Sequence, residues 1–327
     1  MKLSRFYPYQ FSGAAHATEI AAQSVSWGIP AVWFPQSLTV STELCLAAAA
    51  RAVPGCYLGT AVSLMQWRHP LDMALVARSL ADVTGDRFSL GLGVSEPAAV
   101  SNGLGLEYGS AIQYAREYLQ VLVAGIAGGS IALAGTRFHV DAYLPHGNWH
   151  PSVLLGALGP RMAEVAGQFA DGCITWLVPL DYLAGTLICR IKACGAADRE
   201  RRVVALVPFI PTEDAGEVEE TLAHVVRGHL NRPHYKRMLA RAGLPAQASL
   251  DSTLRALRDQ VVLWGTIDQI GSQIRAYASA GVDELAAAIY PTGAAEASEQ
   301  AHILVEIWNQ VARQPNPSDS LVHATRN

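Results

Sequence analysis

The segment LGTAVSLMQWRHPLDMALVARSLADVTGDRFSLGLGVSE, residues 58–96, decides the fold. It is framed by two short apolar runs, Tyr57–Met65 and Phe88–Val94, each bounded by turn residues. Runs of this kind are typical of strands that are buried on both faces of a parallel sheet. Between them, Leu71–Val83 has apolar residues at roughly helical spacing, and Gly85 follows as a helix stop. The segment therefore predicts a strand–helix–strand unit with a right-handed crossover.

The same alternation continues on both sides of this segment. Strands are expected at residues 3–9, 31–36, 57–65, 88–94, 153–157, 173–177, 203–210 and 282–289. Helices are expected at residues 17–27, 42–52, 71–83, 110–127, 182–194 and 302–311, with two more that begin at Pro160 and at the capping box of Thr266. Eight alternations of strand and helix predict an α/β fold, a (β/α)8 TIM barrel.

The domain organisation follows from the segments that do not fit the alternation. Residues 1–313 are expected to form a single barrel domain, with a short hairpin at 131–140. Residues 214–263 are mostly helical and longer than one barrel step needs, so they are interpreted as an insertion over the strand ends. Residues 314–327 carry two prolines among mostly polar residues and are expected to be a loose tail.

Composition limits the classes of function. The net charge of −4 and the pI near 6.2 argue against a nucleic-acid surface. The five cysteines include no CxxC pair, which favours reduced thiols, and the histidines lack the spacing of a metal site. There is no apolar signal region and no apolar run of about 18 residues. We expect a soluble cytoplasmic protein with no metal, no nucleic-acid partner and no membrane span.

Loops at the carboxyl ends of parallel strands are where α/β folds bind ligands. Here the loop that begins at Ser63 and the loop Gly93-Val94-Ser95-Glu96 follow the two strands of the opening segment. The Gly91-x-Gly93 pair lacks the third glycine of a dinucleotide fingerprint. A ligand site is therefore expected at these two loops, without a Rossmann-type motif.

Three stretches carry a resemblance to a known family. LGTAV, RHP and GDRFSLGLG resemble the segment around strands three and four of the luciferase-like family. GALGPRMAEVAGQFADGCITW and GTIDQIGSQIRAYASAGVDEL resemble two later segments of that family, in the same order and with the same spacing. VWFPQ together with RHP is similar to the actinobacterial branch that uses the deazaflavin coenzyme F420. The family also contains reduced-FMN monooxygenases, and its resemblance covers roughly residues 1–313.

The turn Gly156-Ala157-Leu158-Gly159-Pro160 joins a strand to the start of a helix. Free amide groups there, helped by the helix dipole, form an anion site, although the glycines alone would also explain a tight turn. The resemblance implies that Ala157, Leu158, Gly159 and Pro160 hold the cofactor phosphate.

The resemblance also implies further cofactor contacts. Ala61-Val62 is similar to a bulged strand with a non-prolyl cis peptide that presses on the cofactor ring; an ordinary strand pair is the alternative. Ser63, Gly93, Val94 and Ser95 are expected beside it. Trp176, with Trp67 and Tyr7, is expected to wall the ring, and His69 to support its loop.

Two residues are candidates for chemistry. Many deazaflavin relatives place an Asp-His pair near the end of strand two, where this chain has Gln36, which hydrogen-bonds but does not titrate. Glu96 is a candidate general acid if burial raises its pKa, and otherwise a solvated loop carboxylate. Arg232, Lys236 and Arg237 are expected either to grip the cofactor's phosphate and acidic tail or to form a solvated helix face.

These features predict an F420-dependent oxidoreductase that transfers a hydride to an unsaturated or imine-like small molecule. A reduced-FMN monooxygenase is the alternative enzyme. Because the Asp-His pair is missing, a cofactor-binding relative without catalysis is the alternative from another class. A homodimer is left open.

Overall fold

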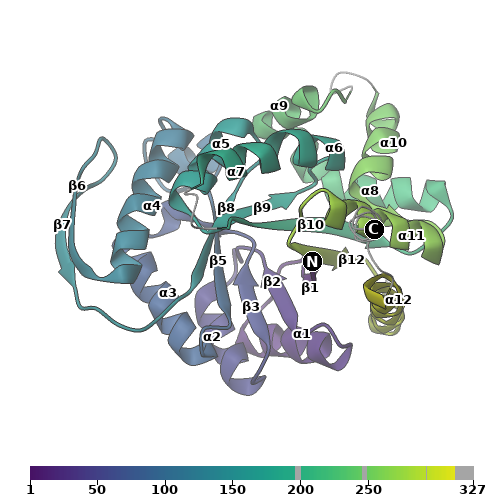
Figure 1. The fold of residues 1–327 in the computed structure, drawn as a ribbon, viewed down its shortest axis with the longest axis horizontal. Coiled ribbons are helices and arrows are strands. Elements are labelled where there is room, and N and C mark those ends of the chain that lie inside the picture. The colour runs from purple at the N-terminus through teal and green to yellow at the C-terminus, as the bar shows by residue number, and fades with distance from the viewer. Residues whose placement is uncertain (196–199, 245–248, 292, 314–327) are drawn as a thin grey trace, which may run out of the picture.

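Eight parallel strands close into a barrel in the computed structural model, which describes residues 1–195, 200–244, 249–291 and 293–313 (Figure 1). The barrel strands are β1 (Lys2–Phe6), β2 (Ala31–Phe34), β3 (Tyr57–Thr60), β5 (Phe88–Gly93), β8 (Ser152–Gly156), β9 (Gly172–Trp176), β10 (Arg202–Ile210) and β12 (Glu284–Ile289). Each pairs with the next in this order, and β12 pairs with β1, which closes the ring. The predicted (β/α)8 barrel is confirmed.

Helices cover the outside of the barrel (Figure 1). They are α1 (Ala14–Ser26), α2 (Thr42–Ala52), α3 (Pro70–Thr84), α4 (Ala111–Ala127), α5 (Pro160–Phe169), α7 (Cys189–Cys194), α11 (Ile267–Ser279) and α12 (Ala294–Arg313). The predicted stops and caps are present: Gly85 ends α3 in the left-handed region at φ 60°, and Thr266 and Gln269 form the capping box of α11.

The predicted strand Tyr57–Met65 is divided in the structure. It ends at Thr60, and a short strand β4 (Ser63–Leu64) and a 3-10 turn η1 (Met65–Trp67) follow. The expected cis peptide between Ala61 and Val62 lies at the division. Both β3 and β4 pair with β5, so the bulged chain lies directly on that strand. A Cβ at Gly91 would clash with the Thr60 carbonyl oxygen, which explains a glycine there.

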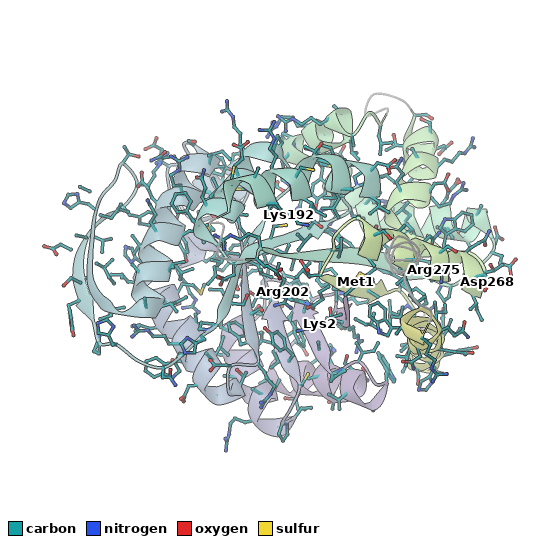
Figure 2. All side chains as sticks on the ribbon, in the orientation of Figure 1. Met1, Lys2, Lys192, Arg202, Asp268 and Arg275 are labelled. Carbon is teal, nitrogen blue, oxygen red and sulfur yellow. The ribbon has the colours of Figure 1, made fainter. Side chains whose placement is uncertain are left out.

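Buried polar groups fill the amino-terminal end of the barrel. The Trp33 indole N–H donates a 2.6 Å hydrogen bond to Glu284, and the Arg202 guanidinium pairs with the same carboxylate. Arg202, labelled in Figure 2, also has its guanidinium carbon 5.7 Å from the centre of the Trp33 ring. A Cβ at Gly59 would clash with that ring, so a glycine makes room for the tryptophan. These groups plug one end of the barrel.

A two-stranded hairpin extends from the barrel, as predicted for residues 131–140 (Figure 1). Its strands β6 (Gly129–Ala134) and β7 (His139–Leu144) pair only with each other among the described residues. The buried carboxylate of Glu117 on α4 accepts hydrogen bonds from the backbone amides of Thr136, Arg137 and Phe138 at the hairpin turn. A single side chain therefore anchors the turn to the barrel.

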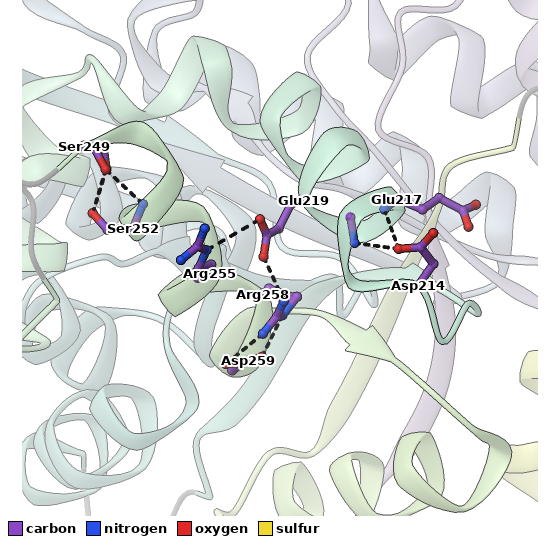
Figure 3. A network of polar contacts seen from close by, with 9 residues as sticks. Asp214, Glu217, Glu219, Ser249, Ser252, Arg255, Arg258 and Asp259 are labelled. Carbon is purple, nitrogen blue, oxygen red and sulfur yellow. Dashed lines mark hydrogen bonds and ion pairs between the residues drawn. The ribbon is translucent and has the colours of Figure 1, made fainter.

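The stretch predicted to be helical, residues 214–263, contains α8 (Ala215–Leu230), α9 (Pro233–Arg241) and α10 (Leu250–Val261). The strand β11 (Leu263–Trp264) ends it and pairs with the last residues of β10. Glu219 on α8 pairs with Arg258 on α10 at 2.8 Å and with Arg255 at 3.9 Å, which holds the two helices together (Figure 3). The tail expected at 314–327 lies outside the described residues.

The predicted helix at 182–194 is interrupted. It consists of a short α6 (Leu180–Tyr182), a π-helical stretch η3 (Leu183–Ile188) and α7. The closing helix α12 begins well before the predicted His302. No helix in the described part of the chain is long and apolar enough to cross a bilayer.

Candidate active site

A cavity of about 1730 Å³ lies at the carboxyl ends of the barrel strands. Ligand pockets usually measure about 300–1,000 Å³, so this one can hold an extended ligand and a second molecule. The predicted site residues that line it are Gln36, Ala61, Val62, Gly93, Val94, Ser95, Glu96, Ala157, Leu158, Gly159, Pro160 and Trp176. Val62, Gly93, Ala157 and Trp176, which come from different parts of the sequence, all line this one cavity.

Ser63 does not line the cavity, contrary to prediction. Its hydroxyl donates a 2.7 Å hydrogen bond to the buried carboxylate of Glu43. The same carboxylate accepts from Ser41 and lies 3.6 Å from the Arg68 guanidinium. The division of the predicted strand turns Ser63 toward this buried group, where it anchors the bulge.

Gln36 lies at the end of β2, but its side-chain amide is engaged by the protein. Its carbonyl oxygen accepts from the Leu64 amide at 3.2 Å, and its NH₂ donates to the Ser37 carbonyl at 3.0 Å. Gln36 therefore ties the loop after β2 to the bulged strand next to the cis peptide. Gln66, which the sequence analysis did not single out, similarly accepts from the Ser95 amide.

Val62 occupies the middle of the rim. Its side chain fills the space that a Cβ at Gly93 would need and lies 3.6 Å from where a Cβ at Gly156 would be. Glycines at the ends of β5 and β8 thus leave a shallow cradle around Val62. The floor of the cavity here consists of glycine backbone and the branched, apolar side chain of Val62.

Trp176, at the end of β9, forms a fixed wall of the cavity. Its ring packs edge-on against Phe6 at 5.2 Å, and its indole N–H donates to Nε2 of His229 on α8 at 3.3 Å. Leu177 follows it with φ 55°, a left-handed conformation unusual for leucine, which orients the strand end. Tyr7, also expected as a wall, is not among the lining residues, whereas Trp67 lines the cavity and is half exposed.

His229 on α8 lines the cavity, although no sequence pattern singles it out. Burial, with the nearby Arg232 and His234, lowers the pKa of its imidazole to about 4. His229 is therefore neutral at physiological pH, and a neutral ring whose Nε2 accepts from Trp176 carries its proton on Nδ1. It positions the indole from the helical region above the barrel.

The start of α5 combines several features that favour an anion. Gly159 is the N-cap residue of α5 and Pro160 the first helical residue, as predicted. The guanidinium of Arg241, at the end of α9, lies 3.1 Å from the position a Cβ at Gly159 would occupy. Arg161 lines the same part of the cavity. Free amides, the helix dipole and two arginines together favour a phosphate.

Helix α9 presents a basic stripe to the cavity. His234, Arg237 and Arg241 lie within about 60° of one another around the helix at 100° per residue, and all three line the cavity. The adjacent Tyr235 and Met238 are buried and anchor the helix, and Tyr235 also lines the cavity. Of the three cations predicted here, Arg232 and Arg237 reach the cavity and Lys236 is not among its lining residues.

Glu96 contributes the one carboxylate among the described residues that line the cavity. It forms an ion pair with Arg232 at 2.7 Å, which links the loop after β5 to the turn between α8 and α9. Both side chains are partly exposed. His69 lies outside the cavity and caps α3 by accepting from the Leu71 amide, which confirms its expected supporting role.

A family model described as luciferase-like monooxygenase matches residues 1–284. The chain belongs to this family. Among curated relatives of this luciferase-like protein, a 5,10-methylenetetrahydromethanopterin reductase of Methanolobus tindarius is 25% identical over 59% of the chain and 60% of its own length. A Mycobacterium tuberculosis protein provisionally named a coenzyme F420-dependent oxidoreductase is 26% identical over 69% of the chain and 76% of its own length.

Solved structures of luciferase-like proteins have the same fold. An F420-dependent secondary alcohol dehydrogenase in complex with an F420-acetone adduct matches with a TM-score of 0.75 at 15% identity, over 95% of the chain and 98% of its own. A Baeyer-Villiger monooxygenase of Pseudomonas putida in complex with FMN matches with a TM-score of 0.69 at 17% identity, over 93% and 96%. The relatives of this luciferase-like protein thus include both F420-dependent oxidoreductases and flavin monooxygenases.

The residues of the cavity fit a deazaflavin or flavin cofactor. Amides and arginines at the start of α5 suit a phosphate, and Val62, Gly93 and Gly156 line the same cavity as Trp176 and give it an apolar surface that suits a flat ring. In the described part of the chain, no group of His, Cys, Asp and Glu side chains is arranged to hold a metal ion.

Proposed function

We propose that this protein is an F420-dependent oxidoreductase that transfers a hydride between the deazaflavin and an unsaturated or imine-like small molecule. The basic stripe of α9 is the observation that carries the proposal. Arg241 ends this helix, and Arg232, which pairs with Glu96, precedes it by nine residues, or about 13.5 Å along the axis at 1.5 Å per residue. The cavity therefore offers cationic groups at two well-separated places.

A ligand with an anionic group at each of these two places can form ion pairs at both. F420 carries a phosphate and an acidic tail, whereas FMN carries one phosphate group. The phosphate fits Gly159, Arg241 and Arg161, and the tail fits Arg232 and Arg237. This division of charge supports F420 over FMN.

The end of β2 supports a reductase. When bound, the reduced deazaflavin supplies the hydride. Gln36 holds the loop and does not titrate, so the chain offers no side-chain base at the position where an alcohol would have to lose its proton. The role of the chain is to bind and orient the two molecules: Val62 and Trp176 shape the ring site, and the cations of α9 hold the anionic groups.

Anaerobic stopped-flow kinetics tests this proposal. Mixing the protein with reduced F420 and an enone or a cyclic imine should return the fluorescence of oxidised F420 as the substrate is reduced. Arg241→Gln should weaken F420 binding without changing the fold seen by circular dichroism. If reduced F420 binds but transfers no hydride to any member of a broad substrate panel, the non-catalytic alternative replaces the proposal.

A reduced-FMN monooxygenase is the second candidate. The match to an FMN-bound monooxygenase and the single phosphate site at α5 favour it. Oxygen consumption with reduced FMN, together with FMN binding tighter than F420 binding, would support this alternative and overturn the first proposal.

A further inference from the structure

The cavity is divided by charge. All of its formally charged side chains among the described residues come from α5, α9, the turn before α9 and the loop after β5. The side chains that line it from the ends of β1, β2, β4 and β12 are uncharged. Five large apolar or aromatic residues line the cavity on that side, and we call them the aromatic compartment: Phe6, Tyr9, Leu38, Trp67 and Tyr290.

The aromatic compartment has ordered walls and an apolar entrance. The rings of Tyr9 and Tyr290 meet edge to face with centroids 5.9 Å apart. Leu38 is 71% exposed and Trp67 49% exposed, so large apolar side chains stand at the mouth without a covering partner among the described residues. Exposed apolar groups beside a cavity mark a place where an apolar ligand enters.

We propose that the aromatic compartment is the substrate subsite and that it takes an uncharged, planar, largely apolar molecule, such as an unsaturated ring ketone or a cyclic imine. This inference rests on the proposed function and adds the substrate class to it. A charged substrate would lose hydration here without gaining a counter-ion, while a flat neutral ring keeps its contacts with the aromatic edges and faces. An anionic substrate would instead compete with the cofactor for the stripe of α9.

Two phenolic hydroxyls can orient a substrate bound in this apolar subsite. Tyr9 and Tyr290 carry them, and burial raises the pKa of both phenols, so each keeps its proton at neutral pH. A protonated phenol donates a hydrogen bond to a carbonyl oxygen or an imine nitrogen. The subsite therefore recognises a neutral ring that bears one acceptor.

Two fluorescent probes with the same skeleton test the subsite without the cofactor. N-phenyl-1-naphthylamine is neutral, and 8-anilinonaphthalene-1-sulfonate adds one sulfonate. We expect the neutral probe to bind with one-to-one stoichiometry and Leu38→Asp to weaken it at least tenfold. Arg237→Gln should leave the neutral probe unchanged and weaken the sulfonate probe. Equal effects of both variants on both probes would overturn the division of the cavity.

Turnover then tests the substrate class. With reduced F420, we expect kcat/KM for 2-cyclohexen-1-one to exceed that for 5-oxocyclohex-3-ene-1-carboxylate, which has the same ring enone and adds one carboxylate, by at least 100-fold. Equal or inverted values would overturn the inference. Absence of turnover on both compounds would contradict the proposed function, while the probe results would still decide whether the neutral subsite exists.

Discussion

Gln36, a candidate for chemistry at the end of β2, uses its side-chain amide to hold two backbone segments together. Its amide joins Ser37 to Leu64, so its loss would leave the partly buried Leu64 amide without a partner. We expect Gln36→Ala to lower the free energy of unfolding by about 1–2 kcal/mol in urea titrations. Gln36→Glu keeps an acceptor for Leu64 and should cost less. A Gln36→Ala variant as stable as the parent would contradict this role.

Glu96 was selected from the sequence as a candidate general acid, and the structure pairs it with Arg232. The Arg232 guanidinium lies 2.7 Å from this carboxylate, so the structure gives Glu96 the place of an ion-pair partner that links two segments. We expect Glu96→Gln to change kcat less than tenfold and to leave the acid limb of the pH–rate profile in place. Affinity for an acidic ligand should rise, because Arg232 becomes free.

The opposite result would restore the catalytic role of Glu96. A general acid contributes about 100-fold or more, so a loss of kcat on that order, together with disappearance of the acid limb, would show that Glu96 donates the proton. Glu96→Asp is the matched variant, since it keeps the charge and shortens the reach.

For single residues, the sequence indicated which side chains lie near strand ends, but it did not indicate which residues of the distant helices contact them. Val62 and Trp176 lie in the predicted strands 57–65 and 173–177, and Gly159 comes just after the predicted strand 153–157, so their place near the strand ends could be deduced. Arg241 and His229 reach the site from helices far along the chain. Their roles depend on how those helices pack, which residue spacing within one helix does not specify.

Among the elements, the hairpin β6–β7 depends on one buried carboxylate. Burial on its own would raise the pKa of Glu117, whereas hydrogen bonds from Gln113 and from the amides of Arg137, Phe138 and Thr136 lower it to about 2. A pKa lower in the folded state than in the unfolded chain stabilises the fold above about pH 4.5. This stabilisation is lost as the pH falls toward 2.

Glu117→Gln tests this anchor. At pH 7 we expect the free energy of unfolding to fall by about 2–3 kcal/mol, because hydrogen bonds to a charged acceptor are replaced by weaker or mismatched ones. The difference from the parent should shrink between about pH 4.5 and pH 2, as the parent carboxylate takes up its proton. A difference that stays constant over this range would contradict the pKa assignment.

The start of α5 gives a second prediction for an element. In Gly159→Asp a carboxylate would stand near Arg241 and the first amides of α5, where it would occupy the anion site. We expect cofactor affinity to fall at least 100-fold by fluorescence titration. Gly159→Asn adds nearly the same volume without the charge and should cost much less. Equal losses in the two variants would point to steric exclusion and against an anion site.

Element boundaries were predicted best where a cap or a glycine marks them. The helix at 42–52 and the stop at Gly85 agree with the structure. The predicted strand 57–65 was too long. Its apolar pattern continues through the bulge, but the extended strand backbone ends at Thr60 and resumes only at Ser63. The π-helical stretch η3 likewise could not be predicted, because the spacing of its apolar residues does not distinguish a π-helix from an α-helix.

For the whole molecule, the fold could be deduced because alternation of strand and helix is repeated along the chain and admits few topologies. The different roles of the two barrel ends could not be deduced from the sequence. Trp33, Arg202 and Glu284 plug the amino-terminal end, and α8 and α9 add charge above the carboxyl end. These residues are distant in sequence, and closure of the barrel brings them together.

The affinities of three ligands test the F420 assignment most directly: F420, an F420 fragment without its glutamate tail, and FMN, measured by fluorescence with the parent, Arg237→Gln and Arg241→Gln. We predict that F420 binds at least tenfold tighter than the other two, and that Arg237→Gln removes this advantage. Arg241→Gln should weaken all three ligands, since each bears a phosphate. FMN binding as tight as F420 binding, with no effect of Arg237→Gln, would contradict the assignment.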